Sequence, residues 1–175
     1  MRANVVRRPL FTWIGLTPAV GFYACAIYVA AFLPEDGYAP PLAIAAFTFF
    51  FWLLGWHSAI RFTATHLSVT NIVVTSTVEW SDVRRVIVHD GLGIELRDGR
   101  ELGSIAFGGS LIGTFSGYPT YQTAYRTLQK ARKKAQHRER HGGPVRVRWS
   151  IDWRRQLTAA AAIYGPLLLL LALRG

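Results

Sequence analysis

The chain has 175 residues, of which 51% are hydrophobic, and a formal net charge of +10. A mean hydropathy of +0.21 together with this charge is not typical of a soluble domain. It favours apolar membrane spans joined to a basic region that lies against an anionic surface. The single cysteine, Cys25, excludes an internal disulfide framework.

The first apolar segment covers residues 9–33 and carries no charged side chain. As a helix it would be about 37 Å long, which is enough to cross a hydrocarbon core of about 30 Å with some tilt. Residues 1–8, which include Arg7 and Arg8, form a short tail before it. The segment exceeds the apolar region of a signal peptide, so we predict a span rather than a cleaved signal.

Two further spans are predicted. Residues 34–40 are rich in turn formers and lead to a second apolar segment, residues 41–60, so the first two spans form a helical hairpin. A third segment, residues 156–173, would be about 27 Å long as a helix, which is just enough to cross. Small residues spaced by four, Gly15 with Ala19 and Ala26 with Ala30, would permit close packing against another helix.

The distribution of Lys and Arg predicts the orientation. The tail before the first span holds 3 of the 20 basic residues, the connection 34–40 holds none, and residues 61–155 hold 16. The positive-inside rule then places the N-terminus and the central segment in the cytoplasm of a multi-pass inner (cytoplasmic) membrane protein. Tryptophans expected at this interface are Trp13, Trp56, Trp149 and Trp153.

The segment between the second and third spans becomes rich in Val, Ile and Thr, with turn residues at short intervals. This pattern predicts short antiparallel strands. Their expected ranges are 63–70, 71–76, 77–80, 83–89, 92–97 and 100–105. Asp98-Gly99 is a two-residue hairpin signal, because both residue types tolerate a positive φ.

An amphipathic helix is predicted after Pro119. Its apolar face holds, at helical spacing, Tyr121, Ala124, Tyr125, Leu128, Ala131 and Ala135. Its opposite face holds Arg126, Lys130, Arg132, Lys133, Lys134, Arg138 and Arg140. Gly142-Gly143-Pro144 ends it. Several short strands followed by one helix predict a small β-sandwich or open barrel whose end the helix plugs.

Residues 142–155 connect this helix to the third span. Residues 145–154 alternate strictly between apolar and polar side chains, which is a strand pattern. Two placements stay open. The segment could add an edge strand to the sheet, or it could lie at the membrane interface with Trp149 in lipid and Arg146 and Arg148 at phosphates.

Residues 61–141 resemble the PH-like (pleckstrin-homology-like) domain of many small bacterial membrane proteins. The matching features are Arg61-Phe62-Thr63, the step Trp80-Ser81-Asp82-Val83, the hairpin at Asp98-Gly99 and the closing helix. The resemblance implies an α + β membrane protein: three transmembrane helices and a PH-like barrel or sandwich capped by a C-terminal amphipathic helix. It implies no enzymatic role. Residues 69–73 contain no Lys or Arg, unlike the first loop of PH domains that bind inositol phosphates.

We expect a membrane-anchored interaction or scaffold module whose basic face contacts anionic lipid or a partner protein. The residues expected to bind lipid or a partner are Arg126, Lys130, Arg132, Lys133, Lys134, Arg138, Arg146, Arg148, Trp149 and Trp153. The alternative is an accessory or regulatory subunit of a membrane enzyme or transporter complex, and a homo-oligomer stays open.

Other functional classes have weaker signals. Nucleic acid is disfavoured because Tyr121 and Tyr125 lie on the apolar helix face and cannot interleave with the basic one. His137 and His141 are four residues apart but have no third ligand nearby in the sequence, so we expect no metal. We also expect no cofactor and no catalytic residue, because no nucleophile–base arrangement is recognisable.

Overall fold

The computed structural model describes residues 3–33, 37–88, 91–108, 119–136 and 144–173. Two compact units emerge, each built from separate stretches of the chain. One combines residues 1–8 with 58–151, and the other combines residues 9–57 with 152–175. We call them the sheet unit and the helical unit.

The helical unit contains three helices that are long and apolar enough to cross a membrane: Pro9–Phe32, Ala39–His57 and Trp153–Ala172. They correspond to α1 (Pro9–Phe32), to α2 (Ala39–Trp52) extended by the π-helical turn η2 (Leu53–His57), and to α5 (Trp153–Ala172). The second helix ends at His57, before the predicted residue 60, because the chain turns into a strand at Ala59. The third starts at Trp153, where the Asp152 side chain accepts a hydrogen bond from the Arg155 backbone N–H and caps the helix.

Small residues bring α1 and the second helix together. A Cβ atom built on Gly15 would lie 2.4 Å from the Cα of Gly55, so both positions require glycine. Gly15, Ala19, Ala26 and Ala30 are all buried within the chain. Ala26 and Ala30 also form a cluster with Leu167 and Leu171 of α5. The small residues predicted to permit close helix packing are therefore used inside the helical unit.

The sheet unit contains a five-stranded antiparallel sheet in the order β1-β2-β3-β4-β8. Its strands are β1 (Asn4–Val6), β2 (Ala59–Phe62), β3 (His66–Asn71), β4 (Val74–Glu79) and β8 (Arg148–Ile151). The predicted strand 71–76 is wrong, because the chain turns at residues 72–73. One strand, β4, then covers residues 74–79, where two strands, 71–76 and 77–80, were predicted. Residues 4–6, predicted to belong to a tail, pair with β2 instead. Of the two placements left open for the segment after α4, the structure shows the edge strand, because residues 148–151 pair with β4.

A second antiparallel sheet has the order β5-β6-β7, with β5 (Val83–Val88), β6 (Gly91–Leu96) and β7 (Glu101–Gly108). The 3-10 turn η3 (Trp80–Asp82) joins β4 to β5. Trp80 is only 2% exposed, and its indole Nε1–H donates to the Thr63 carbonyl at 3.0 Å. A hairpin turn forms around Asp98-Gly99 as predicted, but its loop covers residues 97–100 instead of two residues, and Gly99 has a positive φ of 85° whereas Asp98 does not.

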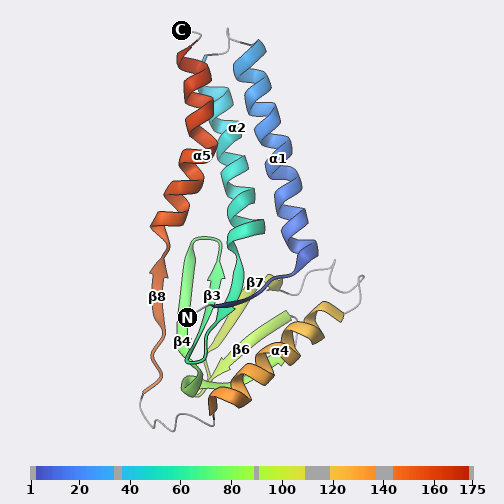
Figure 1. Cartoon of the computed structure of the whole chain (residues 1–175), viewed down its shortest axis with the longest axis vertical. Helices are drawn as coiled ribbons and strands as arrows, with labels where there is room; N and C mark the ends of the chain where they lie inside the picture. Colours follow the sequence, from blue (N-terminus) through green and yellow to red (C-terminus); the bar gives the residue numbers. More distant parts are fainter. Residues whose placement is uncertain (1–2, 34–36, 89–90, 109–118, 137–143, 174–175) are drawn as a thin grey trace. The chain divides into compact units, whose positions relative to one another are not determined.

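The two sheets contact one another through β3 and β7 but stay open over the described residues, so no closed barrel forms there. The Asn71 side chain bridges the gap: its Nδ2 donates to the Gly103 carbonyl at 2.8 Å, and its Oδ1 accepts from the Ile105 N–H at 2.9 Å. Helix α4 (Pro119–Gln136) packs on η3, β5 and β6, so it covers the three-stranded sheet (Figure 1).

Candidate functional site

Helix α4 orients its basic side chains by burying its apolar ones. Tyr121, Ala124, Leu128 and Ala135 are at most 7% exposed, which confirms the apolar face predicted from their spacing. The opposite face exposes Arg126, Lys130, Lys133 and Lys134. No acidic residue occurs between Pro119 and Gln136, so the charged side chains exposed on this face are all basic. Lys133 and Lys134 also lie in the last turn, where cations complement the helix dipole.

Arg132 differs from its neighbours on the helix. Its side chain is half-buried, and its Nε atom makes no hydrogen bond to the described residues. Burial lowers the pKa of its guanidinium, and the nearby Arg97 lowers it further, although Tyr125 acts in the opposite direction. Arg132 therefore contributes less to the outward basic surface than its sequence position predicts. Arg138 lies outside the described residues.

The remaining predicted residues lie on other elements. Arg148 is exposed on β8, in one cross-strand row with Thr77, Ser68 and Arg61. Trp149, 69% exposed, lies on the opposite face of the same strand. Arg146 precedes β8, and its backbone N–H donates to the Asp82 carboxylate at 3.1 Å.

Trp153 is 61% exposed and opens α5 in the helical unit. The nine predicted residues that lie in the described part of the chain therefore divide between α4, the β8 segment and α5. Only the α4 residues among them make one continuous surface on a single element.

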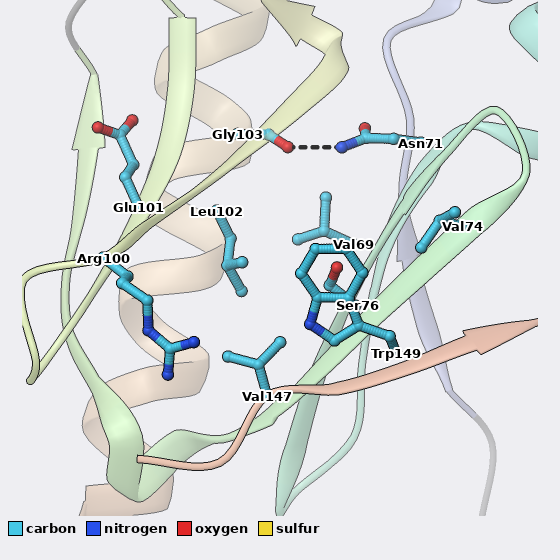
Figure 2. Close-up of a pocket in the computed structure, with 10 residues that line it drawn as sticks. All are labelled: Val69, Asn71, Val74, Ser76, Arg100, Glu101, Leu102, Gly103, Val147 and Trp149. Atoms are coloured by element: carbon cyan, nitrogen blue, oxygen red, sulfur yellow. Dashed lines mark hydrogen bonds between the residues drawn. The ribbon is translucent and has the colours of Figure 1, made fainter.

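A pocket of about 410 Å³ lies between the two sheets. Figure 2 shows its lining from β3, β4, β7 and the β8 segment, with the side chains of Val69, Leu102, Val147 and Trp149 around it and Glu101 turned away. The Asn71–Gly103 hydrogen bond crosses one side. Arg100 stands at the rim, but its guanidinium is paired with Asp98 at 2.7 Å. The lining offers apolar surface without a convergent set of polar groups.

Two carboxylates of the three-stranded sheet are tied to arginines. Glu95 pairs with Arg85 and, at 3.0 Å, with Arg84, and the hydrogen bond from Arg85 is the main reason that its pKa falls below the ordinary value of 4.5. At Asp98 burial acts to raise the pKa, but hydrogen bonds from the Arg100 backbone and guanidinium bring it below 3.8. These arginines are therefore engaged within the sheet unit, unlike the exposed lysines of α4.

Arg8 is a residue whose role sequence reasoning missed. It was expected to flank the first span at the interface, but it is only 6% exposed. Its Nη1 donates to the Tyr121 hydroxyl at 2.9 Å, and that hydroxyl donates to the Gly108 carbonyl at 3.1 Å. Its guanidinium also lies 5.0 Å from the centre of the Tyr121 ring. Nothing in the local sequence separates this arginine from Arg7.

No group of three or more potential metal ligands occurs among the residues that the structure describes. His137 and His141 lie outside that part of the chain. His57, at the end of the second helix, is 2% exposed and stacks on Trp52 with ring centres 5.9 Å apart.

No family model matches the chain, and searches of curated proteins and of solved structures found no match. The PH-like resemblance therefore depends on the chain's own residues and strands.

Proposed function

We propose that this chain is a membrane-anchored PH-like interaction module whose basic α4 face binds anionic lipid on the cytoplasmic side of the membrane. The observation that carries the proposal is the α4 surface, where Arg126, Lys130, Lys133 and Lys134 are exposed with no acidic residue on the helix. Three helices in the same chain are long and apolar enough to cross a bilayer, which would hold that surface near it. Each basic residue near an anionic leaflet contributes about 1 kcal/mol of attraction.

Further features support the PH-like interpretation. Three strands, β2 to β4, are followed by three more, β5 to β7, and then by the amphipathic helix α4. The Trp80-Ser81-Asp82-Val83 step joins the two sheets, with Trp80 buried at the junction. The turn at residues 72–73 carries no Lys or Arg, so it offers no stereospecific pocket for an inositol phosphate. The proposed lipid contact is instead a general electrostatic attraction to anionic headgroups.

The test uses the full chain in nanodiscs. In a Cys25→Ser background, a fluorophore at Thr127→Cys, an exposed position between Arg126 and Lys130, reports on quenching by lipids with a headgroup nitroxide. We expect stronger quenching in phosphatidylglycerol nanodiscs than in phosphatidylcholine nanodiscs, and its loss in 1 M salt, where the screening length falls to about 3 Å.

Charge variants make the test specific. Replacing Lys130, Lys133 and Lys134 by glutamine should weaken docking by about 3 kcal/mol, roughly 100-fold. The matched control replaces the same three residues by arginine and should retain docking. Equal quenching in neutral and anionic nanodiscs would refute the proposal. A stoichiometric protein recovered in mild detergent, together with that result, would favour the accessory-subunit alternative.

A further inference from the structure

One end of the five-stranded sheet is where the chain passes to and from all three apolar helices. β1 ends at Val6 shortly before α1, β2 begins at Ala59 directly after the second helix and Ser58, and β8 ends at Ile151 before α5. The pairings Val6–Ile60, Ala59–Thr70 and Val74–Ile151 place these strand ends on the same end of the sheet. Connections of one or two residues span only about 3.5 Å per residue. This end must therefore lie close to the membrane surface if the helices cross.

The turn between β3 and β4 lies at that same end, because Asn71 pairs with Val74. Its two loop residues are Ile72 and Val73, whereas two-residue hairpins favour glycine or asparagine. Ile72 has a φ of 51° and is the one non-glycine residue with positive φ in the described part of the chain. A β-branched residue is sterically disfavoured in this conformation. The turn at Asp98-Gly99, in contrast, follows the usual preference with a glycine at positive φ.

The unusual turn is nevertheless held in place. The Ile72 backbone N–H donates to the Ser58 Oγ at 3.0 Å, and Ser58 directly follows the second helix. Residues 69–74 carry no charged side chain. Trp149 pairs with Ser76, which is two residues along β4 from Val74 at the turn. Its side chain is 69% exposed, and tryptophan is enriched at membrane interfaces. Ile72 and Val73 are both apolar and partly exposed, and transfer of such side chains from water into hydrocarbon is favourable.

We propose that Ile72 and Val73 form an apolar wedge that contacts the boundary between headgroups and acyl chains of the bilayer. The occupant of this surface is lipid hydrocarbon, and no anionic headgroup is needed. The wedge would fix the depth of the sheet unit at the membrane, while the proposed α4 contact depends on lipid charge.

The experiment measures the environment of spin labels on the full chain, in a Cys25→Ser background, in nanodiscs of phosphatidylcholine alone. One label is placed at Val73→Cys. The matched control is Ala64→Cys, an exposed position in the β2–β3 turn at the opposite end of the same sheet. Oxygen, which concentrates in hydrocarbon, and a water-soluble nickel chelate compete as relaxing agents. We expect the oxygen-to-nickel accessibility ratio to be at least tenfold higher at residue 73 than at residue 64.

Ile72→Cys provides an independent label at the same turn, so the measurement does not depend on the assembly of a single variant. Equal ratios at the two ends of the sheet would overturn the proposal, and so would a label at residue 73 that both agents fail to reach. Because the lipid is neutral, failure of the α4 proposal would leave a high ratio at residue 73 unchanged.

Discussion

Tyr121 contacts groups from two other parts of the sequence, Arg8 and residues 107–108. Its hydroxyl accepts from Arg8 and donates to the Gly108 carbonyl, and its ring packs edge-on against Phe107 with centres 6.0 Å apart. Arg8 follows β1, so this residue ties the N-terminal strand to the helix that carries the basic surface. At the scale of single residues, the sheet unit is therefore held by a few polar side chains as well as by its apolar core.

Tyr121→Phe tests this connection. The variant keeps the ring but loses both hydrogen bonds of the hydroxyl, so we expect a loss of about 2 kcal/mol in the free energy of unfolding. Chemical unfolding of the full chain in detergent, followed by near-UV circular dichroism, measures it. Tyr125→Phe is the control, because that half-buried hydroxyl receives one hydrogen bond, from Gln129 on the same helix. Equal losses for the two variants would contradict the role given to Tyr121.

Glu95 predicts a pH dependence. Its pKa in the folded protein is below 4.5, so its ionised form favours folding above that pH, and this stabilisation is lost as the pH falls below 4.5. We expect Glu95→Gln to flatten the decline of stability in acid, as measured by thermal unfolding between pH 3 and pH 7. Replacing Arg84 and Arg85 by glutamine should flatten it similarly. Additive effects of the two changes would show that the groups are not coupled.

At the scale of elements, side chains and glycines decide how strands and helices meet. The side-chain amide of Asn71 bonds to two backbone groups of β7, the Gly103 carbonyl and the Ile105 N–H. In a continuous sheet, the backbone of a neighbouring strand would bond to such groups. Gly15 and Gly55 let the backbones of α1 and the second helix approach directly. Both contacts join elements whose sequence patterns alone do not reveal the partner.

Asn71→Asp should loosen the contact between the sheets. The carboxylate can still accept from the Ile105 N–H but cannot donate to the Gly103 carbonyl, so one exposed hydrogen bond is lost and we expect a cost of about 0.5 to 1.5 kcal/mol. Hydrogen exchange read by mass spectrometry should show faster exchange in the peptide containing Ile105. The same substitution at the exposed Asn4 of β1 serves as the control. Unchanged protection of that peptide would remove Asn71 from its bridging role.

Gly15→Ala should disrupt the helical hairpin. Its new Cβ would lie 2.4 Å from the Gly55 Cα, and relief of such overpacking costs about 1 to 3 kcal/mol. Gly21→Ala on the same helix is matched, because a Cβ there meets nothing within 4 Å. Thermal unfolding in detergent should show a lowered midpoint for the first variant only. Similar midpoints would mean that the two helices can separate at no cost.

At the scale of the whole molecule, the chain alternates between its two units. The sheet unit is assembled from residues before the first helix and between the second and third, and three apolar helices form the other unit. This interleaving means that each of the three apolar helices directly follows or precedes, along the chain, a strand of the five-stranded sheet.

The basic residues predict the direction in which these helices would cross a membrane. With 16 of 20 Lys and Arg between residues 61 and 155, the sheet unit should face the cytoplasm. A protease-cleavable tag inserted after residue 141 should stay intact in whole cells and be cut after lysis. A cysteine at Tyr38, in the connection after the first span, should instead react with an impermeant reagent from outside. Cleavage of the tag in intact cells would show that the sheet unit faces outward and that the predicted orientation is wrong.

The three apolar helices and the amphipathic α4 could be predicted from the sequence, because length, hydropathy and a 3.6-residue period are local properties. The hairpin at Asp98-Gly99 was predictable for the same reason. The predicted strand 71–76 was wrong, because Ile72 and Val73 are typical strand residues and gave no sequence signal for the turn that they form. The placement of β1 was missed, because three residues beside an apolar segment carry too little pattern.

The candidate site divides in the same way. The sequence by itself determined which residues of α4 are basic and that its other face is apolar, since both follow from spacing along one helix. Only the tertiary structure decided that Arg132 is partly buried, that Arg8 bonds to Tyr121 and that Asn71 joins two open sheets. Those outcomes depend on contacts between residues far apart in the chain, which no local period encodes.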